Sequence, residues 1–187
     1  AETEALVLSL GEKKFRATQV YQWLWQKRVR SFEQMTNLSQ SLRDTLSEHF
    51  YCQTIKSTTV HKSSDGSMKF GFSLSDGKIV EGVLIPAKDR MTACISSQVG
   101  CGLQCTFCAT GALGFIRNLS VGEITDQFFY MDAEARNATG NGISNIVYMG
   151  MGEPLMNYDA VMASISRLTE PNAVGMAPSR ITLSTAG

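Results

Sequence analysis

The second half of the chain alternates short apolar stretches with longer amphipathic ones, and this rhythm constrains the fold more than any other feature. The expected strands cover residues 92–97, 144–149 and 180–184, and the expected helices cover about 120–136 and 159–169. A capping box, Ser120 with Glu123, marks the start of the first helix. Strands that alternate with helices predict an α/β fold with a parallel sheet and right-handed crossovers.

The first half has two different patterns, so we expect two smaller parts before the α/β region. Residues 1–50 have helical spacing, and Ser31 with Gln34 is a second capping box. Residues 51–90 alternate in polarity, with strands at 69–74 and 78–85 around the turn at 75–77. The expected division is a helical accessory domain (1–50), a small β linker unit (51–90) and an α/β region (91–187).

Composition excludes few functions. The 187 residues are 43% hydrophobic and 18% charged, which favours a packed core over disorder. Seventeen basic and seventeen acidic residues cancel, so overall charge indicates no partner. No apolar run is long enough for a membrane helix, and the start, Ala1-Glu-Thr-Glu, has no hydrophobic secretory segment. We expect a cytoplasmic protein without membrane association. Because the last residues read as a strand entering a turn, we expect a fragment.

Three cysteines, Cys101, Cys105 and Cys108, lie within eight residues directly after the first expected α/β strand. They supply three thiolates, so an iron–sulfur cluster held there would keep one iron open for another ligand. A zinc site normally needs four ligands, and the two histidines lie far upstream. Zinc and unreactive cysteines stay open as alternatives, while a disulfide would close strained small loops.

The carboxyl ends of parallel strands lie at one edge of a sheet, where ligands collect. The cysteine loop, the Gly150-Met-Gly-Glu-Pro154 loop and the turn at 184–187 each follow an expected strand. Glycines let the backbone approach a ligand, and Glu153 can accept hydrogen bonds from an amino group. A plain tight turn and a solvated carboxylate are the alternatives. Beside three thiols, however, the loop indicates a site for a cofactor with an amino-acid head.

These motifs together resemble one family. They are Ala93-Cys-Ile-Ser-Ser-Gln-Val-Gly-Cys101, Phe107-Cys-Ala-Thr-Gly111, Gly114-Phe-Ile-Arg-Asn-Leu119, Met149-Gly-Met-Gly-Glu-Pro-Leu155 and Thr182-Leu-Ser-Thr-Ala-Gly187. The set is similar to the radical S-adenosylmethionine (SAM) dual-specificity rRNA/tRNA adenine-C2 methyltransferases. Arg16, Gln19, Trp23 and Phe32-Glu-Gln-Met-Thr-Asn37 resemble that family's N-terminal accessory domain. The resemblance implies the first half of a radical SAM (β/α) barrel after that domain and the β unit.

The resemblance also implies a ligand set. Cys101, Cys105 and Cys108 would ligate three irons of a 4Fe–4S cluster, and Gly152, Glu153 and Ser184 would contact S-adenosyl-L-methionine. Glu81 matches the proton acceptor, and Cys94 matches the cysteine that resolves a covalent protein–RNA intermediate through a disulfide. Without the family, Glu81 would be an exposed strand carboxylate and Cys94 a small buried hydrophobe.

The implied activity is methylation of carbon 2 of adenine in 23S rRNA and tRNA through a methyl-cysteine. The implied partners are these RNAs and an electron donor such as flavodoxin or ferredoxin. The methyl-carrying cysteine of the family lies in sequence that this chain does not contain, and Cys52 lies in the wrong region to replace it. We therefore expect no complete methyl transfer from these residues alone. A sibling that methylates carbon 8, and a zinc-stabilised RNA-binding module using the basic N-terminal helices, are the alternatives.

Overall fold

The computed structural model describes residues 2–186, which divide into two compact units. The helical unit takes the residues up to Gln53 together with Glu170–Gly175. The sheet unit takes Thr54–Thr169 together with the residues from Met176 onward. Within residues 2–186, no helix combines the length and the apolarity that a membrane crossing requires.

The helical unit is built from short helices around its own apolar core. Its elements are α1 (Glu2–Ser9), α2 (Phe15–Trp25), the 3-10 helix η1 (Phe32–Gln34) and α3 (Gln40–His49). The core residues are Val7, Ala17, Val20, Phe32, Met35, Leu38, Leu42 and Leu46. The capping box of Ser31 and Gln34 is confirmed at the start of η1. At the start of α3, the Ser39 hydroxyl accepts the Leu42 N–H.

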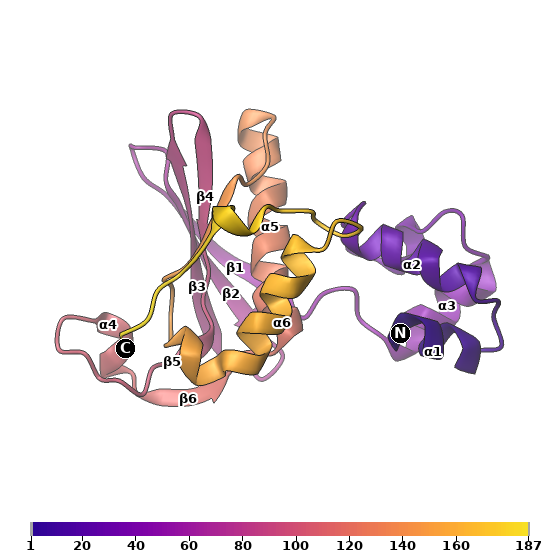
Figure 1. Ribbon diagram of the computed structural model, residues 1–187, viewed down its shortest axis with the longest axis horizontal. Helices are drawn as coiled ribbons and strands as arrows, with labels where there is room; N and C mark the ends of the chain where they lie inside the picture. The colour runs from indigo at the N-terminus through magenta and orange to yellow at the C-terminus, as the bar shows by residue number, and fades with distance from the viewer. Residues whose placement is uncertain (1, 187) are drawn as a thin grey trace. The chain divides into compact units, whose positions relative to one another are not determined.

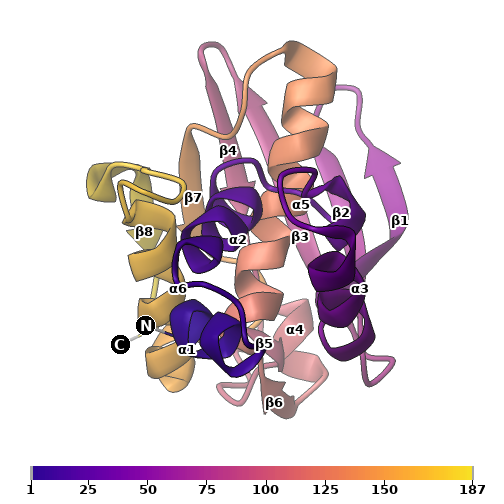
Figure 2. The same ribbon diagram turned by 90° about the vertical axis from the view of Figure 1, so that its right-hand side faces the viewer.

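The sheet unit (Figure 1) contains a six-stranded mixed sheet, whose order β1-β2-β3-β4-β7-β8 can be followed in Figure 2. Its strands are β1 (Ile55–Lys62), β2 (Met68–Leu74), β3 (Ile79–Ala87), β4 (Arg90–Cys94), β7 (Asn145–Tyr148) and β8 (Ile181–Leu183). Strands β1 to β4 pair antiparallel, whereas β4, β7 and β8 pair parallel. The expected α/β class with parallel strands is confirmed.

The strands expected as a linker unit share this sheet. β3 pairs with β4 over five residue pairs from Val83–Cys94 to Ala87–Arg90, so the pairing runs on from β3 into the parallel part. β1 was not expected, because its sequence is mostly polar and, except for Ile55, its side chains are at least partly exposed. Its pairing to β2 therefore depends on backbone hydrogen bonds more than on an apolar face.

Two helices, α5 (Val121–Thr139) and α6 (Tyr158–Thr169), lie on the same side of the sheet (Figures 1 and 2). The Ser120–Glu123 capping box begins α5, as predicted, and Gly140 ends it in the left-handed conformation. Tyr130 of α5 meets the rings of Phe70 and Phe72 edge-on. This aromatic contact fixes α5 against the antiparallel strands.

A small two-stranded sheet at the carboxyl end of β4 completes the unit. Its strands are β5 (Gln98–Gly100) and β6 (Phe115–Asn118), which pair antiparallel with an irregularity at Val99–Gly100. The short helix α4 (Ala109–Ala112) lies between them, and the 3-10 helices η2 (Pro154–Asn157) and η3 (Pro178–Arg180) precede α6 and β8. The β5–β6 pair was not predicted, and it holds the cysteine loop at its two ends.

Candidate functional site

The loops after β4 and β7 are joined by backbone hydrogen bonds. The Gly150 N–H donates to the Ile95 carbonyl at 3.1 Å, and the Ser97 N–H donates to the Met151 carbonyl at 2.8 Å. There is no room for a side chain at residue 150, because a Cβ there would lie 2.7 Å from the Ile95 oxygen. The predicted meeting of these loops at one edge is therefore present, and the glycine serves loop packing.

Cys101 follows β5 and is buried. Its N–H donates to the Gly114 carbonyl at 3.0 Å, which closes the loop that carries all three cysteines. Cys105 and Cys108 are only partly buried, and the Cys108 N–H donates to the Cys105 carbonyl at 3.0 Å. One thiol is thus fixed at the base of the loop and two lie nearer its surface.

A pocket of about 470 Å³ lies inside the cysteine loop and has Cys105 and Cys108 in its lining. Hydrogen bonds from the backbone of Gly111 and then Thr110 lower the pKa of the Cys108 thiol, which favours the thiolate that binds metal. A Cβ at Gly111 would lie 3.0 Å from the Cys105 nitrogen, so a larger residue would crowd the loop. Thiolate donors are the ligands that hold iron–sulfur clusters, so the two thiols of this pocket match that chemistry.

The three thiols are not gathered around one point. Among residues 2–186, no three His, Cys, Asp or Glu side chains form a group that could hold a metal ion. Cys101 also lies outside the set of residues that line the pocket, which are Gln104, Cys105, Thr106, Cys108, Gly111, Ala112, Leu113 and Gly114. The fit to a cluster thus rests on the donor chemistry and the pocket. For all three cysteines to ligate one cluster, the loop has to move so that their thiols come together.

Glu153 is buried, and hydrogen bonds hold both of its carboxylate oxygens. One accepts the Leu155 N–H and the other accepts the Ala186 N–H, each at 3.0 Å. Burial raises the pKa of Glu153, but the backbone N–H groups of Ala186 and Leu155 outweigh it, so the pKa is lowered overall. The carboxylate therefore ties the loop after β7 to the turn after β8, in addition to any contact with a ligand.

Ser184 is exposed and directly follows β8, two residues before the Ala186 amide that Glu153 holds. Its position brings it to the same edge as Gly152 and Glu153. Gly187, the last residue of the motif, lies outside the described residues.

Glu81 and Cys94 lie on one face of the sheet. A Cβ at Gly82 would meet Met131 of α5, so the side chain of Glu81 faces away from that helix. Cys94 pairs with Val83, two residues from Glu81, and therefore shares its face. The Glu81 carboxylate forms an ion pair with Lys69 at 2.7 Å. Burial raises the pKa of the Cys94 thiol, more than the Met149 backbone lowers it.

The sequence of this chain is similar to those of several known proteins. The family described as ribosomal RNA large subunit methyltransferase N-terminal domain matches residues 1–52. A probable dual-specificity RNA methyltransferase RlmN from Cytophaga hutchinsonii is 51% identical over 186 residues, covering 100% of this chain and 51% of the relative. The dual-specificity RNA methyltransferase RlmN from Oleidesulfovibrio alaskensis is 48% identical, covering 97% of this chain and 51% of the relative.

The same relationship is found among solved structures. A crystal structure of a radical SAM methyltransferase from Sphaerobacter thermophilus superposes with a TM-score of 0.94 at 37% identity, covering 98% of this chain and 54% of that chain. Over nearly its whole length the chain is similar to dual-specificity RNA methyltransferases and to a radical SAM methyltransferase. It spans about half the length of the curated relatives it matches.

Buried polar residues that sequence reasoning missed tie the loops of the site together. The Ser96 hydroxyl donates to the Glu81 carbonyl at 2.6 Å and accepts the Met151 N–H at 2.8 Å. The Asn157 amide donates to the carbonyls of Ser97 and Leu119. Two of these residues, Ser96 and Ser97, lie in the sequence motif that ends at Cys101, but the motif does not indicate which residues they bond to.

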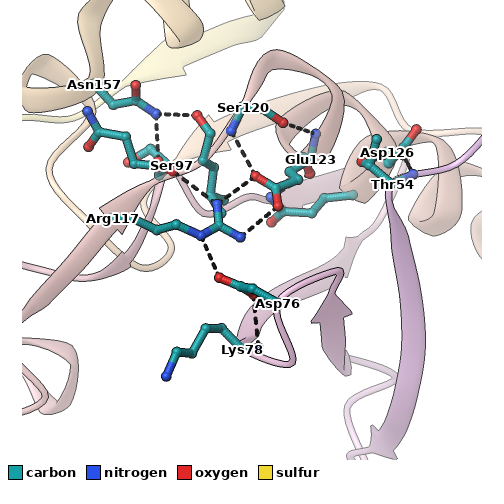
Figure 3. A network of polar contacts seen from close by, with 12 residues as sticks. Thr54, Asp76, Lys78, Ser97, Arg117, Ser120, Glu123, Asp126 and Asn157 are labelled. Atoms are coloured by element: carbon teal, nitrogen blue, oxygen red, sulfur yellow. Dashed lines mark hydrogen bonds and ion pairs between the residues drawn. The ribbon is translucent and has the colours of Figure 1, made fainter.

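Arg117 of β6 joins three segments of the sheet unit through a charged network (Figure 3). Its guanidinium donates to both carboxylate oxygens of Glu123, at 2.9 and 2.8 Å, and to Asp76 at 2.8 Å. Glu123 is buried and also accepts the Ser120 N–H at the start of α5. The network fixes the strand after the cysteine loop to α5 and to the turn between β2 and β3.

Proposed function

We propose that this protein is a radical SAM methyltransferase that modifies carbon 2 of adenine in 23S rRNA and tRNA. The observation that carries the proposal is that the segment leading into the three-cysteine loop, residues 95–98, bonds to the Gly150–Glu153 loop at the carboxyl ends of β4 and β7. Relatives named dual-specificity RNA methyltransferase support the substrate class. The basic residues of the helical unit supply charges suited to RNA phosphates.

Different residues of this chain have different proposed roles in cofactor binding. Cys101, Cys105 and Cys108 would hold a 4Fe–4S cluster, whose bound form supplies the electron for reductive cleavage of SAM and hence the radical chemistry that an unreactive C–H bond needs. A donor such as flavodoxin or ferredoxin would deliver that electron. Gly152, Glu153 and Ser184 would orient the methionine part of SAM at the same edge.

Glu81 and Cys94 would act on the RNA adduct from their shared sheet face. The Glu81 carboxylate, which forms an ion pair with Lys69 at 2.7 Å, would accept the proton from carbon 2. The Cys94 thiol would resolve the covalent intermediate through a disulfide. Burial raises the pKa of Cys94 and keeps the thiol protonated, so it stays unreactive until the adduct is formed.

Metal loading tests the cofactor part of the proposal. The chain is reconstituted with iron and sulfide without oxygen, and iron content and visible absorption are measured. We expect a coloured protein that loses iron when Cys101, Cys105 and Cys108 are all changed to Ala, whereas Cys52→Ala keeps it as the matched control. A colourless protein that binds zinc, or unchanged iron in the triple variant, would show the proposal to be wrong.

Nucleoside mass spectrometry tests the RNA part. Deleting the gene that encodes this chain should remove 2-methyladenosine from the 23S rRNA and tRNA of the source organism. Persistence of 2-methyladenosine, or loss of 8-methyladenosine instead, contradicts the proposed substrate position.

A further inference from the structure

Gln98, the first residue of β5, is 1% exposed and lies between two loops of the site. Its side-chain oxygen accepts the Glu153 N–H at 2.9 Å, and its side-chain nitrogen donates to the Asn118 oxygen at 2.7 Å. One amide therefore satisfies a donor in the loop after β7 and an acceptor in β6. Losing it would leave the buried Glu153 N–H unpaired, which is costly, whereas Asn118 is exposed.

Steric packing gives an independent second observation. A Cβ at Gly152 would lie 2.5 Å from the Gln98 Cβ and 2.7 Å from its Cγ. The Gly152 backbone thus rests directly on the Gln98 side chain. Glycine is required here by this contact, apart from any contact with a ligand.

The contacts close into a ring. Asn118, which pairs with Gln98 across the two strands, donates from its side chain to the Met156 carbonyl at 3.3 Å. Met156 lies three residues after Glu153, so Gln98, Asn118 and the 153–156 segment hold each other in place. β5 then leads within three residues to Cys101.

We propose that Gln98 is a positioning residue that sets the Gly152–Glu153 backbone relative to the strand leading into the cysteine loop. The inference rests on the proposed function, because the two segments matter together only if one holds SAM and the other a cluster. Gln98 touches neither group in this role. It acts through Glu153 and Asn118, and an amide suits it because it donates and accepts without adding charge to a buried site.

The first test uses the chain without cofactor. Gln98→Met keeps the length of the side chain and removes both hydrogen bonds, and hydrogen–deuterium exchange is followed by mass spectrometry. We expect the Glu153 amide to exchange at least about tenfold faster. Gln127→Met is the matched control, because Gln127 is equally buried but bonds to Ser96 and Glu123. Equal exchange at Glu153 in both variants would overturn the proposal.

The second test measures SAM binding to the iron-loaded chain by calorimetry. We expect Gln98→Met to keep its iron and to bind SAM at least about tenfold more weakly than Gln127→Met. Wild-type affinity in Gln98→Met, with SAM bound by the wild type, would refute the positioning role alone. A wild type that takes up no iron would instead refute the proposed function.

A conservative variant keeps the proposal testable if Gln98→Met does not fold. Gln98→Glu retains the oxygen that accepts the Glu153 N–H and loses the donor to Asn118. We expect it to restore most of the exchange protection at Glu153. If the Glu153 amide exchanges in Gln98→Glu as fast as in the unfolded chain while the β2–β3 amides stay protected, the bond from the Glu153 N–H to the side chain of residue 98 does not hold this loop, and the proposal is wrong in that step.

Discussion

Two glycines of the cysteine hairpin share a left-handed backbone but differ in the space around them. Gly100 has φ of 73° and Gly114 has φ of 69°. A Cβ at Gly100 would lie 1.8 Å from the Gly114 oxygen, whereas a Cβ at Gly114 would have nothing within 4 Å. Substitutions at these two glycines therefore distinguish the free energy lost to backbone strain from the free energy lost to a steric clash.

We expect Gly100→Ala to lower the free energy of unfolding by about 3 kcal/mol or more, because strain and clash add. Gly114→Ala should cost only about 1 kcal/mol, since strain acts alone. Urea unfolding followed by circular dichroism measures both values. Equal costs for the two variants would mean that the hairpin relaxes around the new methyl group.

At the scale of elements, the Arg117 network joins β6, α5 and the β2–β3 turn. The side-chain hydrogen bond from Arg117 is the largest influence on Asp76 and lowers its pKa from 3.8 to about 2. Burial raises the pKa of Glu123, but hydrogen bonds from Arg117 and the Ser120 backbone outweigh it and lower the pKa overall. The same two carboxylates raise the pKa of Arg117.

Because both carboxyl pKa values are lower in the folded chain, their contribution to stability is present above the unfolded values near pH 4 and is lost as the pH falls towards 2. We expect Arg117→Leu to destabilise the chain clearly at pH 6 and much less at pH 2. Unfolding free energies of wild type and variant at both pH values give the comparison. A difference that does not change with pH would contradict the ionic role of Arg117.

The elements that the sequence predicted are those with local signals. α5 has a capping box at Ser120, and β7 is an apolar stretch bounded by turn residues, so both could be placed before the structure was known. β1 and the β5–β6 pair lack such signals, because a mostly exposed strand and a three-residue strand are specified by partners distant in sequence. The same limit applies to the site. Cysteine spacing indicated a cluster, but no spacing shows that Glu153 bonds to Ala186 or Gln98 to Asn118.

At the scale of the whole molecule, the two units have separate cores. Leu46 is 1% exposed in the helical unit and Leu84 is 0% exposed in the sheet unit. The apolar cluster around Leu46 consists of residues of the helical unit, which predicts that the units lose structure separately.

We expect Leu46→Ala to cost about 2 to 5 kcal/mol within the helical unit. Hydrogen exchange should then speed up in residues 2–50 while the sheet unit keeps its protection. Leu84→Ala is the matched variant and should show the opposite pattern. Faster exchange in both units after either change would mean that the chain unfolds as one cooperative body.

Ser96 gives the connection between β3 and the loop after β7 a direction. A hydroxyl has one proton, and here that proton goes to the Glu81 carbonyl, so towards Met151 the oxygen can only accept. The order therefore runs from Met151 through Ser96 to Glu81 and cannot reverse. The backbone of the candidate base and the backbone of the candidate cofactor loop thus bond to the same hydroxyl group. Loss of this hydroxyl would take a partner from the Met151 N–H and from the Glu81 carbonyl at the same time.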